Sequence, residues 1–456
     1  MIFSLSNKKL QFALALGIPF LVYFLAPQSM GEAARRICFI FSFAALFWAF
    51  EIIPLFATSL LVVVLEVLLL CRPGGVLGMD QSGYQIFLVP FGSPVIILFF
   101  GGFVLAAAMQ KYHVDQLIAE YLLKIFGTKP YFLMLGFMVT TAFLSMWMSN
   151  TATAAMMLVM VKPILSQLKQ NDPFKIALIL AITFAANIGG IGTPVGTPPN
   201  AIAIGVLANQ GIHLSFVGWM KMAIPLAVLL LAVLSVLLTW MYPAKEKRIM
   251  VKVASLGLKT VQSRWTLTIA ACTVLLWLTS EWHKIPSSIV SLIAAGAFLT
   301  LGLLNKDDLK NIEWDVLVLM WGGLALGEGM AVSGFTDWVV HQPLFQQKGA
   351  VLVGVFCLLS VVLSTFMSNT ATANLMVPVV MAIPGENNVL LAITVALCCS
   401  FAMALPVSTP PNAIAFSTNM IKGKDMFKAG LLVSVISVIL ILLGYNFMIT
   451  RAFNLP

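Results

Sequence analysis

Two short polar strings each occur twice in this chain, inside long apolar segments. The string Ser-Asn-Thr-Ala-Thr-Ala occupies residues 149–154 and again residues 368–373. The string Thr-Pro-Pro-Asn-Ala-Ile-Ala follows each copy, at residues 197–203 and 409–415. Hydroxyl, amide and backbone carbonyl oxygens can ligate an alkali cation, and amide and helix-terminal N–H groups can donate to an anion. These strings therefore have the residue types needed to bind a cation and an anion side by side.

The order and separation of the two strings indicate that the chain contains a duplicated half. Gly, Pro and small polar residues in the middle of apolar segments are typical of broken membrane helices. Their presence at matching positions of two halves is the best sequence indication of a transporter's substrate site. Small residues at four-residue spacing also occur at plain helix contacts in membranes. The matched duplication of both strings favours a binding site over such contacts.

The composition is that of a membrane protein. The chain has 456 residues, of which 60% are hydrophobic and 9% charged, with a mean hydropathy of +1.00. Soluble domains have about 25% charged residues. The net charge of +9 arises from basic residues scattered among loops. We therefore predict an all-α polytopic membrane protein that lies in the lipid bilayer. We do not expect it to bind nucleic acid.

Apolar runs of about 20 residues, each long enough to cross the hydrocarbon core, recur along the chain. We predict 11 transmembrane helices plus two re-entrant hairpins, arranged as one extra helix and two inverted repeats of five (1+5+5). The predicted spans are residues 10–26, 37–53, 55–70, 93–109, 176–206, 222–242, 267–280, 287–303, 316–330, 389–419 and 427–447. The spans at 176–206 and 389–419 contain the Thr-Pro-Pro strings and should be broken.

The two Ser-Asn-Thr-Ala-Thr-Ala strings lie near the middle of apolar segments 131–161 and 351–383. Each segment is either one tilted span or two half-length helices in a re-entrant hairpin. We favour hairpins, because Lys129 and Lys162 then lie on the same membrane face. Residues 111–127 and 333–348 are predicted to be interfacial helices. The basic loop at 243–264 indicates a cytoplasmic N-terminus and a periplasmic C-terminus.

Charged side chains are absent from both predicted hairpins. An anion would therefore be bound by helix N-termini, each worth about 0.3–2 kcal/mol, and by neutral side chains. The neutral donors and hydroxyls in the two pairs of strings are Asn150, Thr151, Asn369, Thr370, Thr197 and Thr409. Together these groups suit carboxylate oxygens.

A companion cation follows from the energetics of charge burial. Moving a carboxylate out of water costs several kcal/mol, which dipoles and neutral hydrogen bonds offset only in part. Backbone carbonyls and Ser, Thr or Asn oxygens at half-helix ends suit sodium. The membrane potential contributes about 2.3 kcal/mol per charge per 100 mV, so an excess of cations would drive an anion inward. A Lys or Arg in the hairpins would instead have favoured an exchanger.

The remaining reactive residues do not indicate an enzyme. The six cysteines lack metal-ligand spacing, the four histidines are dispersed, and no Gly-x-Ser-x-Gly or His-Glu-x-x-His string is present. Glu66 and Glu328 lie inside predicted spans, where an acid is functional by default. A structural role or a subunit contact is an equally good interpretation of these two acids.

The paired strings resemble those of the divalent anion/sodium symporter family, the INDY-type di- and tricarboxylate carriers, which have a Ser-Asn-Thr motif in each inverted repeat. The resemblance covers nearly the whole chain. It implies a homodimer and an elevator mechanism. It also implies a scaffold formed by residues 1–128 and 265–343 and transport portions formed by residues 129–242 and 344–456.

The resemblance also assigns binding residues. It implies a first sodium site formed by Ser145, Ser149, Asn150 and Gly196. It implies a second sodium site formed by Ser364, Met367, Asn369 and Ser408. Substrate would contact Asn150, Thr151, Thr197, Ser368, Asn369, Thr370 and Thr409.

From these observations we expect sodium-coupled symport of a C4-dicarboxylate such as succinate across a bacterial inner membrane, with sodium ion as the co-transported cofactor. The alternatives are a sodium-independent dicarboxylate exchanger of the same fold and a symporter for sulfate or citrate.

Overall fold

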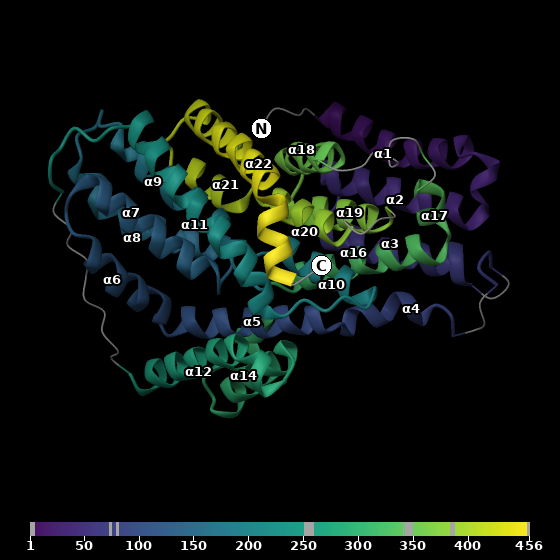
Figure 1. Cartoon of the computed structure of the whole chain (residues 1–456), viewed down its shortest axis with the longest axis horizontal. Helices are drawn as coiled ribbons and strands as arrows, with labels where there is room; N and C mark the ends of the chain where they lie inside the picture. The colour runs from purple at the N-terminus through teal and green to yellow at the C-terminus, as the bar shows by residue number, and fades with distance from the viewer. Residues whose placement is uncertain are drawn as a thin grey trace. The chain divides into compact units, whose positions relative to one another are not determined.

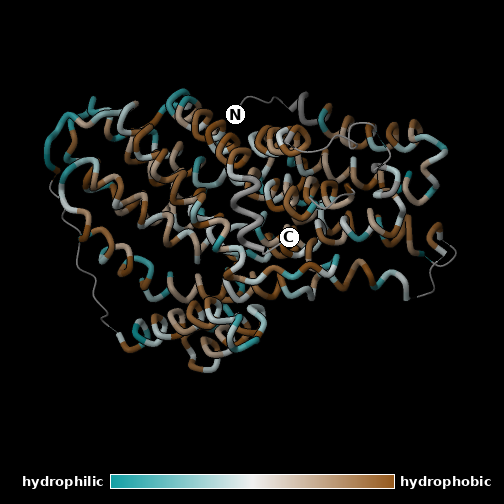
Figure 2. The backbone as a smooth tube through the Cα atoms, viewed as in Figure 1, coloured by the Kyte–Doolittle hydropathy of each residue, from teal (hydrophilic) through white to brown (hydrophobic). Residues whose placement is uncertain are grey.

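The computed structural model describes residues 5–72, 75–78, 82–249, 260–340, 342, 350–383 and 388–453. Within these ranges the chain is helical and has no β-strand, which confirms the predicted all-α class. Hydrophobic residues dominate the helices, and hydrophilic residues are concentrated in the connections (Figure 2). In the same ranges, five helices are long and apolar enough to cross a membrane without interruption. The number of 11 spans and their inverted repeat remain predictions.

The chain divides into two compact units. Unit 1 contains residues 1–96, 201–213 and 313–399, and unit 2 contains residues 97–200, 214–312 and 400–456. These boundaries differ from the predicted scaffold and transport portions, whose assignment stays a prediction.

Unit 1 contains the N-terminal helices and the second predicted hairpin (Figure 1). Its elements are α1 (Leu5–Leu25), η1 (Gln28–Met30), α2 (Glu32–Phe50), α3 (Leu55–Glu66), the π-helical η2 (Val67–Cys71), α4 (Gln85–Leu88), η3 (Val89–Gly92), most of α10 (Pro198–Asn209), α16 (Trp314–Val332), α17 (Phe335–Val340), α18 (Ala350–Phe366), α19 (Asn369–Met381) and α20 (Asn388–Cys399).

The core of unit 1 lies among α2, α3, α16 and α19, which pack against one another (Figure 1). Pro54 lies between α2 and α3, at the boundary of the predicted spans 37–53 and 55–70. The indole Nε1 of Trp48 donates to the carbonyl of Leu55 at 3.1 Å across this break. A Cβ placed at Gly322 would lie 2.4 Å from Cβ of Ser59. Glycine therefore allows α16 to approach α3 more closely than any other residue would.

Unit 2 contains the first predicted hairpin and the C-terminal helices (Figure 1). Its elements are most of α5 (Pro94–Lys111), α6 (Val114–Phe126), α7 (Pro130–Ser145), α8 (Asn150–Gln167), α9 (Phe174–Gly190), α11 (Phe216–Met241), α12 (Val261–Leu278), α13 (Ser280–His283), α14 (Ser287–Thr300), α15 (Lys306–Lys310), α21 (Pro410–Ser417) and α22 (Gly423–Phe453).

The helices α7, α8, α9 and α11 form a packed group within unit 2 (Figure 1). A Cβ at Gly189 would lie 2.3 Å from the carbonyl oxygen of Ala142, so the glycine permits close contact of α9 with α7. This contact brings the end of α9 to the end of α7, where the first polar string begins.

The polar strings interrupt helices, as predicted. In each predicted hairpin the first helix ends shortly before the Ser-Asn-Thr string and a new helix starts inside it. Each predicted broken span likewise contains two helices, α9 and α10 or α20 and α21. Of the predicted interfacial pieces, α6 accounts for most of 111–127. The second piece contains α17, and its residues 341 and 343–348 lie outside the described residues.

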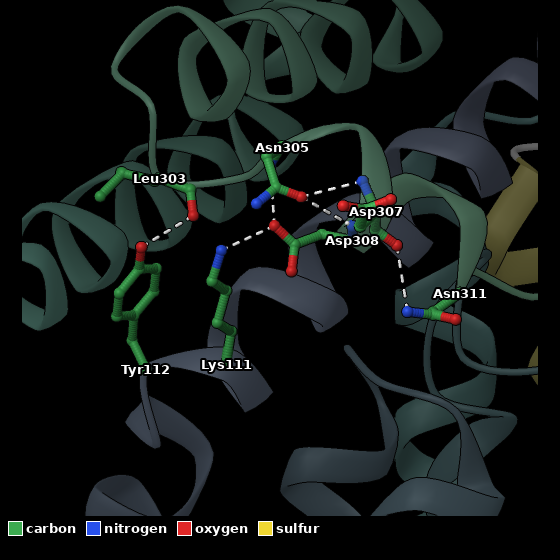
Figure 3. Close-up of polar contacts among 7 residues, drawn as sticks. All are labelled: Lys111, Tyr112, Leu303, Asn305, Asp307, Asp308 and Asn311. Carbon is green, nitrogen blue, oxygen red and sulfur yellow. Dashed lines mark hydrogen bonds and ion pairs between the residues drawn. The ribbon is translucent and has the colours of Figure 1, made fainter.

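An ion pair joins α5 to the short helix α15 in unit 2 (Figure 3). Nζ of Lys111 donates to Oδ2 of Asp308 at 2.6 Å, and the same oxygen accepts the backbone N–H of Asn305 at 2.7 Å. Partial burial raises the pKa of Asp308, but the hydrogen bonds from Lys111 and Asn305 outweigh this effect and hold the pKa below its ordinary value. The carboxylate thus both caps α15 and ties it to α5.

We predict that Asp308→Asn lowers the free energy of unfolding by about 1 kcal/mol at neutral pH, because it removes an ion pair and a helix cap. Since the folded-state pKa of Asp308 is depressed, this contribution is present above the unfolded pKa of about 3.9 and is lost as the pH falls through the folded pKa. Thermal unfolding of the purified protein at several pH values measures both effects. In the control variant Asp307→Asn, which affects only an exposed pair with Lys310, the change should be smaller.

Candidate functional site

The first polar string forms a turn between two helices in unit 2. α7 ends at Ser145, and α8 begins at Asn150 after the N-cap Ser149, whose hydroxyl accepts the N–H of Ala152 at 3.3 Å. Ser149 has extended backbone angles, which end the preceding turn and start a new helix. The N–H groups of the first turn of α8 consequently point to the tip, with the positive end of the helix dipole.

Three oxygen atoms converge beside this tip. Oγ of Ser145 lies 2.5 Å from Oδ1 of Asn150 and 2.8 Å from the carbonyl oxygen of Ala186 on α9. Ser145 is fully buried, and its hydroxyl has one proton, which can be donated to only one of these two acceptors. A cation satisfies the surplus oxygens; otherwise the Asn150 amide must rotate to present its nitrogen.

Glycines bring the broken span against the same tip. A Cβ at Gly190 would lie 2.4 Å from Oδ1 of Asn150, and a Cβ at Gly196 would lie 2.4 Å from the carbonyl oxygen of Gly190. Gly196 therefore packs against Gly190, and Gly190 packs against the Asn150 side chain. Together with Ser145 and Ser149, this places all four residues of the predicted first sodium site in one small region of unit 2.

The break between α9 and α10 is held by an asparagine. Nδ2 of Asn200 donates to the carbonyl oxygens of Gly190 at 3.0 Å, Ile191 at 3.3 Å and Thr193 at 2.8 Å. The indole Nε1 of Trp219 donates to the Ile191 carbonyl at 2.8 Å. These bonds satisfy carbonyls that the helix break leaves without a helical partner.

Two further contacts fix the turn itself. The hydroxyl of Thr193 donates to the carbonyl of Met146, which connects the break to the hairpin tip. The ring of Trp147 stacks on the rings of Phe216 and Trp277, with centroids 6.3 Å away in both cases. This aromatic packing holds the turn against α11 and α12.

The second polar string repeats the geometry of the first in unit 1. Ser368 is the N-cap of α19 and accepts the N–H of Ala371 at 3.1 Å. Oγ of Ser364 lies 2.7 Å from Oδ1 of Asn369 and 2.7 Å from the carbonyl oxygen of Cys399 on α20. Ser364 is also fully buried. The same surplus of oxygens over protons therefore occurs at both tips.

The second break has the same asparagine brace and lies in unit 2. Nδ2 of Asn412 donates to the carbonyls of Met403 at 3.0 Å and Leu405 at 2.9 Å. Thr409 is the N-cap of α21. Nδ2 of Asn187 on α9 donates to the Thr409 hydroxyl at 3.2 Å, which ties the first half of the chain to the second break.

The predicted second sodium site has residues in both units. Met367 is buried in the turn next to Ser364 and Asn369 in unit 1. Ser408 is in the break of unit 2, where its hydroxyl accepts the N–H of Leu405 at 3.3 Å. A common site for Ser408 and the other three residues stays a prediction.

The predicted substrate contacts lie at the tips and breaks. Asn150 and Thr151 begin α8, Asn369 and Thr370 begin α19 after Ser368, and all five side chains are partly exposed. Thr197 and Thr409 are buried residues immediately before α10 and α21. Each tip therefore presents an amide, hydroxyls and a helix N-terminus, which can bind carboxylate oxygens. Their convergence on one substrate stays a prediction.

Several contributors were missed from the sequence. The carbonyls of Ala186 and Cys399 belong to apolar residues, so no side-chain pattern could have indicated them. Asn200 and Asn412 occupy the same position of the repeated Thr-Pro-Pro-Asn string, which could have identified them. Asn187 lies close to Gly189 in an apolar span. A polar side chain at that position could have identified it as a candidate site residue.

Residues 6–450 match the family described as the sodium:sulfate symporter transmembrane region. The chain belongs to this family. It is therefore a membrane transporter rather than an enzyme, as predicted. The resemblance stated from the paired strings is confirmed.

Curated relatives cover nearly the whole chain. The sodium-dependent dicarboxylate transporter SdcS of Staphylococcus saprophyticus is 32% identical over 469 residues, covering 93% of this chain and 88% of the relative. The SdcS protein of Staphylococcus aureus (strain USA300) is 32% identical over 467 residues, covering 92% and 87%.

A solved structure supports the fold. The YdaH transporter of Alcanivorax borkumensis matches with a TM-score of 0.60 and 13% identity, covering 86% of this chain and 98% of that protein. At this identity the likeness concerns the fold alone. It agrees with the polytopic helical architecture.

We predict that Asn200→Ala and Asn412→Ala each lower the free energy of unfolding by about 1–3 kcal/mol, because each removes the amide donor to a buried carbonyl, that of Gly190 or Met403. Melting temperature in detergent measures the effect. The control is Asn311→Ala, since Asn311 is exposed and donates only to the carbonyl of Asp307. Equal melting temperatures for Asn200→Ala and the control would contradict the bracing role.

Proposed function

We propose that this chain transports a C4-dicarboxylate such as succinate together with sodium across a bacterial inner membrane. The observation that supports this most is the recurrence of one arrangement at both tips: a buried serine oxygen, an asparagine oxygen and a carbonyl at the end of the next helix. The names of the SdcS relatives support both the ion and the substrate class.

The oxygens and helix N-termini at the tips would bind sodium and the dicarboxylate together. A sodium ion at each tip would neutralise the surplus of oxygens, and it would also place positive charge beside the N-terminus of α8 or α19. The dicarboxylate would then receive N–H and hydroxyl donors from both tips and the electrostatic support of the ions. A dianion needs this support because the tips contain no basic side chain.

The conformational proposal is an elevator. Residues 129–242 and 344–456 would move as transport portions against a scaffold of residues 1–128 and 265–343 in a homodimer. The N-terminus would be cytoplasmic and the C-terminus periplasmic, as the basic loop at 243–264 indicates. The inverted repeat would give the two halves opposite orientations, so that both tips face one substrate.

Uptake of labelled succinate into proteoliposomes tests the proposal. We expect uptake under an inward sodium gradient and background uptake when potassium replaces sodium. Equal uptake in the two salts would contradict symport, and a requirement for internal dicarboxylate would instead establish exchange. Competition by unlabelled sulfate or citrate, compared with unlabelled succinate, ranks the remaining substrate classes.

We predict that Asn150→Ala and Asn369→Ala each reduce sodium-driven uptake at least tenfold. Each removes a proposed sodium ligand, and a polar bond to a charged group is worth about 1.5–3 kcal/mol, while 1.4 kcal/mol is a tenfold change in affinity. Initial rates at several sodium concentrations measure the loss. The control is Asn171→Ala, because Asn171 is exposed in the loop between α8 and α9. Near-normal rates for either tip variant would refute its assignment.

We further predict that Gly190→Ala abolishes sodium-driven uptake, because its Cβ would displace the Asn150 amide. Gly102→Ala is the matched control, since a Cβ there meets Val195 at an ordinary 3.6 Å. Both variants place a methyl group in a helix of the same unit. If the two variants transport at similar rates, the position of Asn150 does not matter for transport.

A further inference from the structure

One acid is buried without a partner in unit 1. Glu66 is the last residue of α3, its exposed fraction is 0%, and neither carboxyl oxygen has a hydrogen-bond partner among the described residues. A Cβ placed at Gly329 on α16 would lie 2.3 Å from Oε1 of Glu66. The carboxyl group therefore lies directly against a glycine of the neighbouring helix.

The immediate surroundings of Glu66 are apolar. Cδ1 of Ile37 lies 2.8 Å from the same Cβ position at Gly329, on the side of α2. Val62, Val63 and Leu70, from the turns before and after Glu66, belong to the buried hydrophobic cluster of unit 1. The chain then continues as the π-helix η2, and such insertions into α-helices are frequent at functional sites.

The two arginines on α2 have other partners. Arg36 on α2 donates to Oε1 of Glu32 at 2.8 Å and to the carbonyl of Leu69 at 2.8 Å. Arg35 donates to the carbonyl of Tyr23 at 3.2 Å and contacts Glu32 at 3.6 Å. Both guanidinium groups are thus engaged with Glu32 and with backbone carbonyls rather than with Glu66.

A second acid immediately precedes the glycine that Glu66 contacts. Glu328 immediately precedes Gly329 on α16, is partly exposed, and accepts Nδ2 of Asn209 on α10 at 2.7 Å. The described titratable or charged residues on the elements packed around Glu66 are Glu32, Arg35, Arg36 and Cys38 on α2, Cys71 on η2, and Asp315 and Glu328 on α16. None of the basic groups among them is bonded to Glu66.

Glu120 on α6 shows how this chain handles a buried acid that is charged. Its side chain is 5% exposed, and Nζ of Lys124, one turn later, lies 2.6 Å from Oε1. Glu66 has neither a lysine nor any other donor in reach within the described part of unit 1. A bare carboxylate in an apolar surrounding is strongly unfavourable, and an adjacent carboxylate increases that penalty.

We propose that Glu66 is a proton-binding site inside the membrane: its carboxyl group is a neutral acid, and Glu328 is the partly exposed carboxylate through which its proton exchanges with water. A proton from water adds to Glu328, passes to a Glu66 oxygen, forms an O–H bond there and leaves Glu328 ionised. The pair then carries one negative charge in place of two. This site is independent of sodium and substrate at the tips.

Infrared difference spectroscopy of the full-length protein in lipid tests the proposal at neutral pH. The wild-type spectrum minus that of Glu66→Gln should contain the carbonyl stretch of a protonated carboxylic acid, and this band should shift on uniform ¹³C-glutamate labelling. Glu66→Asp should retain the band at a shifted frequency. Glu120→Gln is the matched control, because removing a lysine-paired carboxylate should leave the band intact.

Spectra in sodium and in potassium buffers distinguish proton binding by Glu66 from metal-ion binding. We expect the band to have the same intensity in sodium and in potassium, without dicarboxylate, so that its outcome does not depend on the proposed transport activity. Loss of the band in sodium alone would mean that Glu66 binds the cation. No difference between wild type and Glu66→Gln would mean that Glu66 is ionised. Either result would overturn the proposal.

Discussion

At each tip one buried serine hydroxyl, with a single proton, faces two acceptor oxygens. At the first tip the single hydroxyl proton of Ser145 faces the Asn150 amide oxygen and the Ala186 carbonyl. At the second tip Ser364 faces Asn369 and Cys399 in the same way. Both serines are fully buried, so bulk water cannot supply the missing donors. The proposed sodium ion would ligate these oxygens, whereas without an ion the asparagine amide rotates and donates to the serine. Helix packing keeps these groups together.

Helix breaks at this depth require their own support. Irregular backbone inside a membrane must have its polar groups satisfied by protein. Asn200 and Asn412 provide this, each with one amide nitrogen directed at two or three carbonyls. Glycines contribute by allowing close contact, since a methyl group at Gly190 would occupy the space of the Asn150 amide. The backbone carbonyls at the breaks therefore have hydrogen-bond donors within the protein.

Acidic side chains in this chain have different kinds of partner. Glu120 has a lysine one turn away, and Asp308 has both a lysine and a backbone N–H. At the tips the available groups are neutral oxygens and helix ends. Glu66 differs from all of these because it lies against glycine and aliphatic side chains. A neutral acid is the protonation state that such a surrounding favours.

The sequence by itself determined the helical class, the membrane location and the positions of the helix breaks. These depend on local properties: apolar runs, proline and glycine, and strings that recur in the same order. It also provided Ser145, Asn150, Ser364 and Asn369 as candidate sodium ligands, from a repeated string and a family resemblance, and their role stays a prediction.

Only the tertiary structure decided which partners meet those side chains. The carbonyls of Ala186 and Cys399 are backbone atoms of apolar residues, brought to the tips by helix packing across intervals of 41 and 35 residues. The unpartnered state of Glu66 likewise depends on where α2 and α16 place Ile37 and Gly329. The sequence specifies side chains, but which backbone atoms meet them, and which side chains have no partner, depends on how the helices pack.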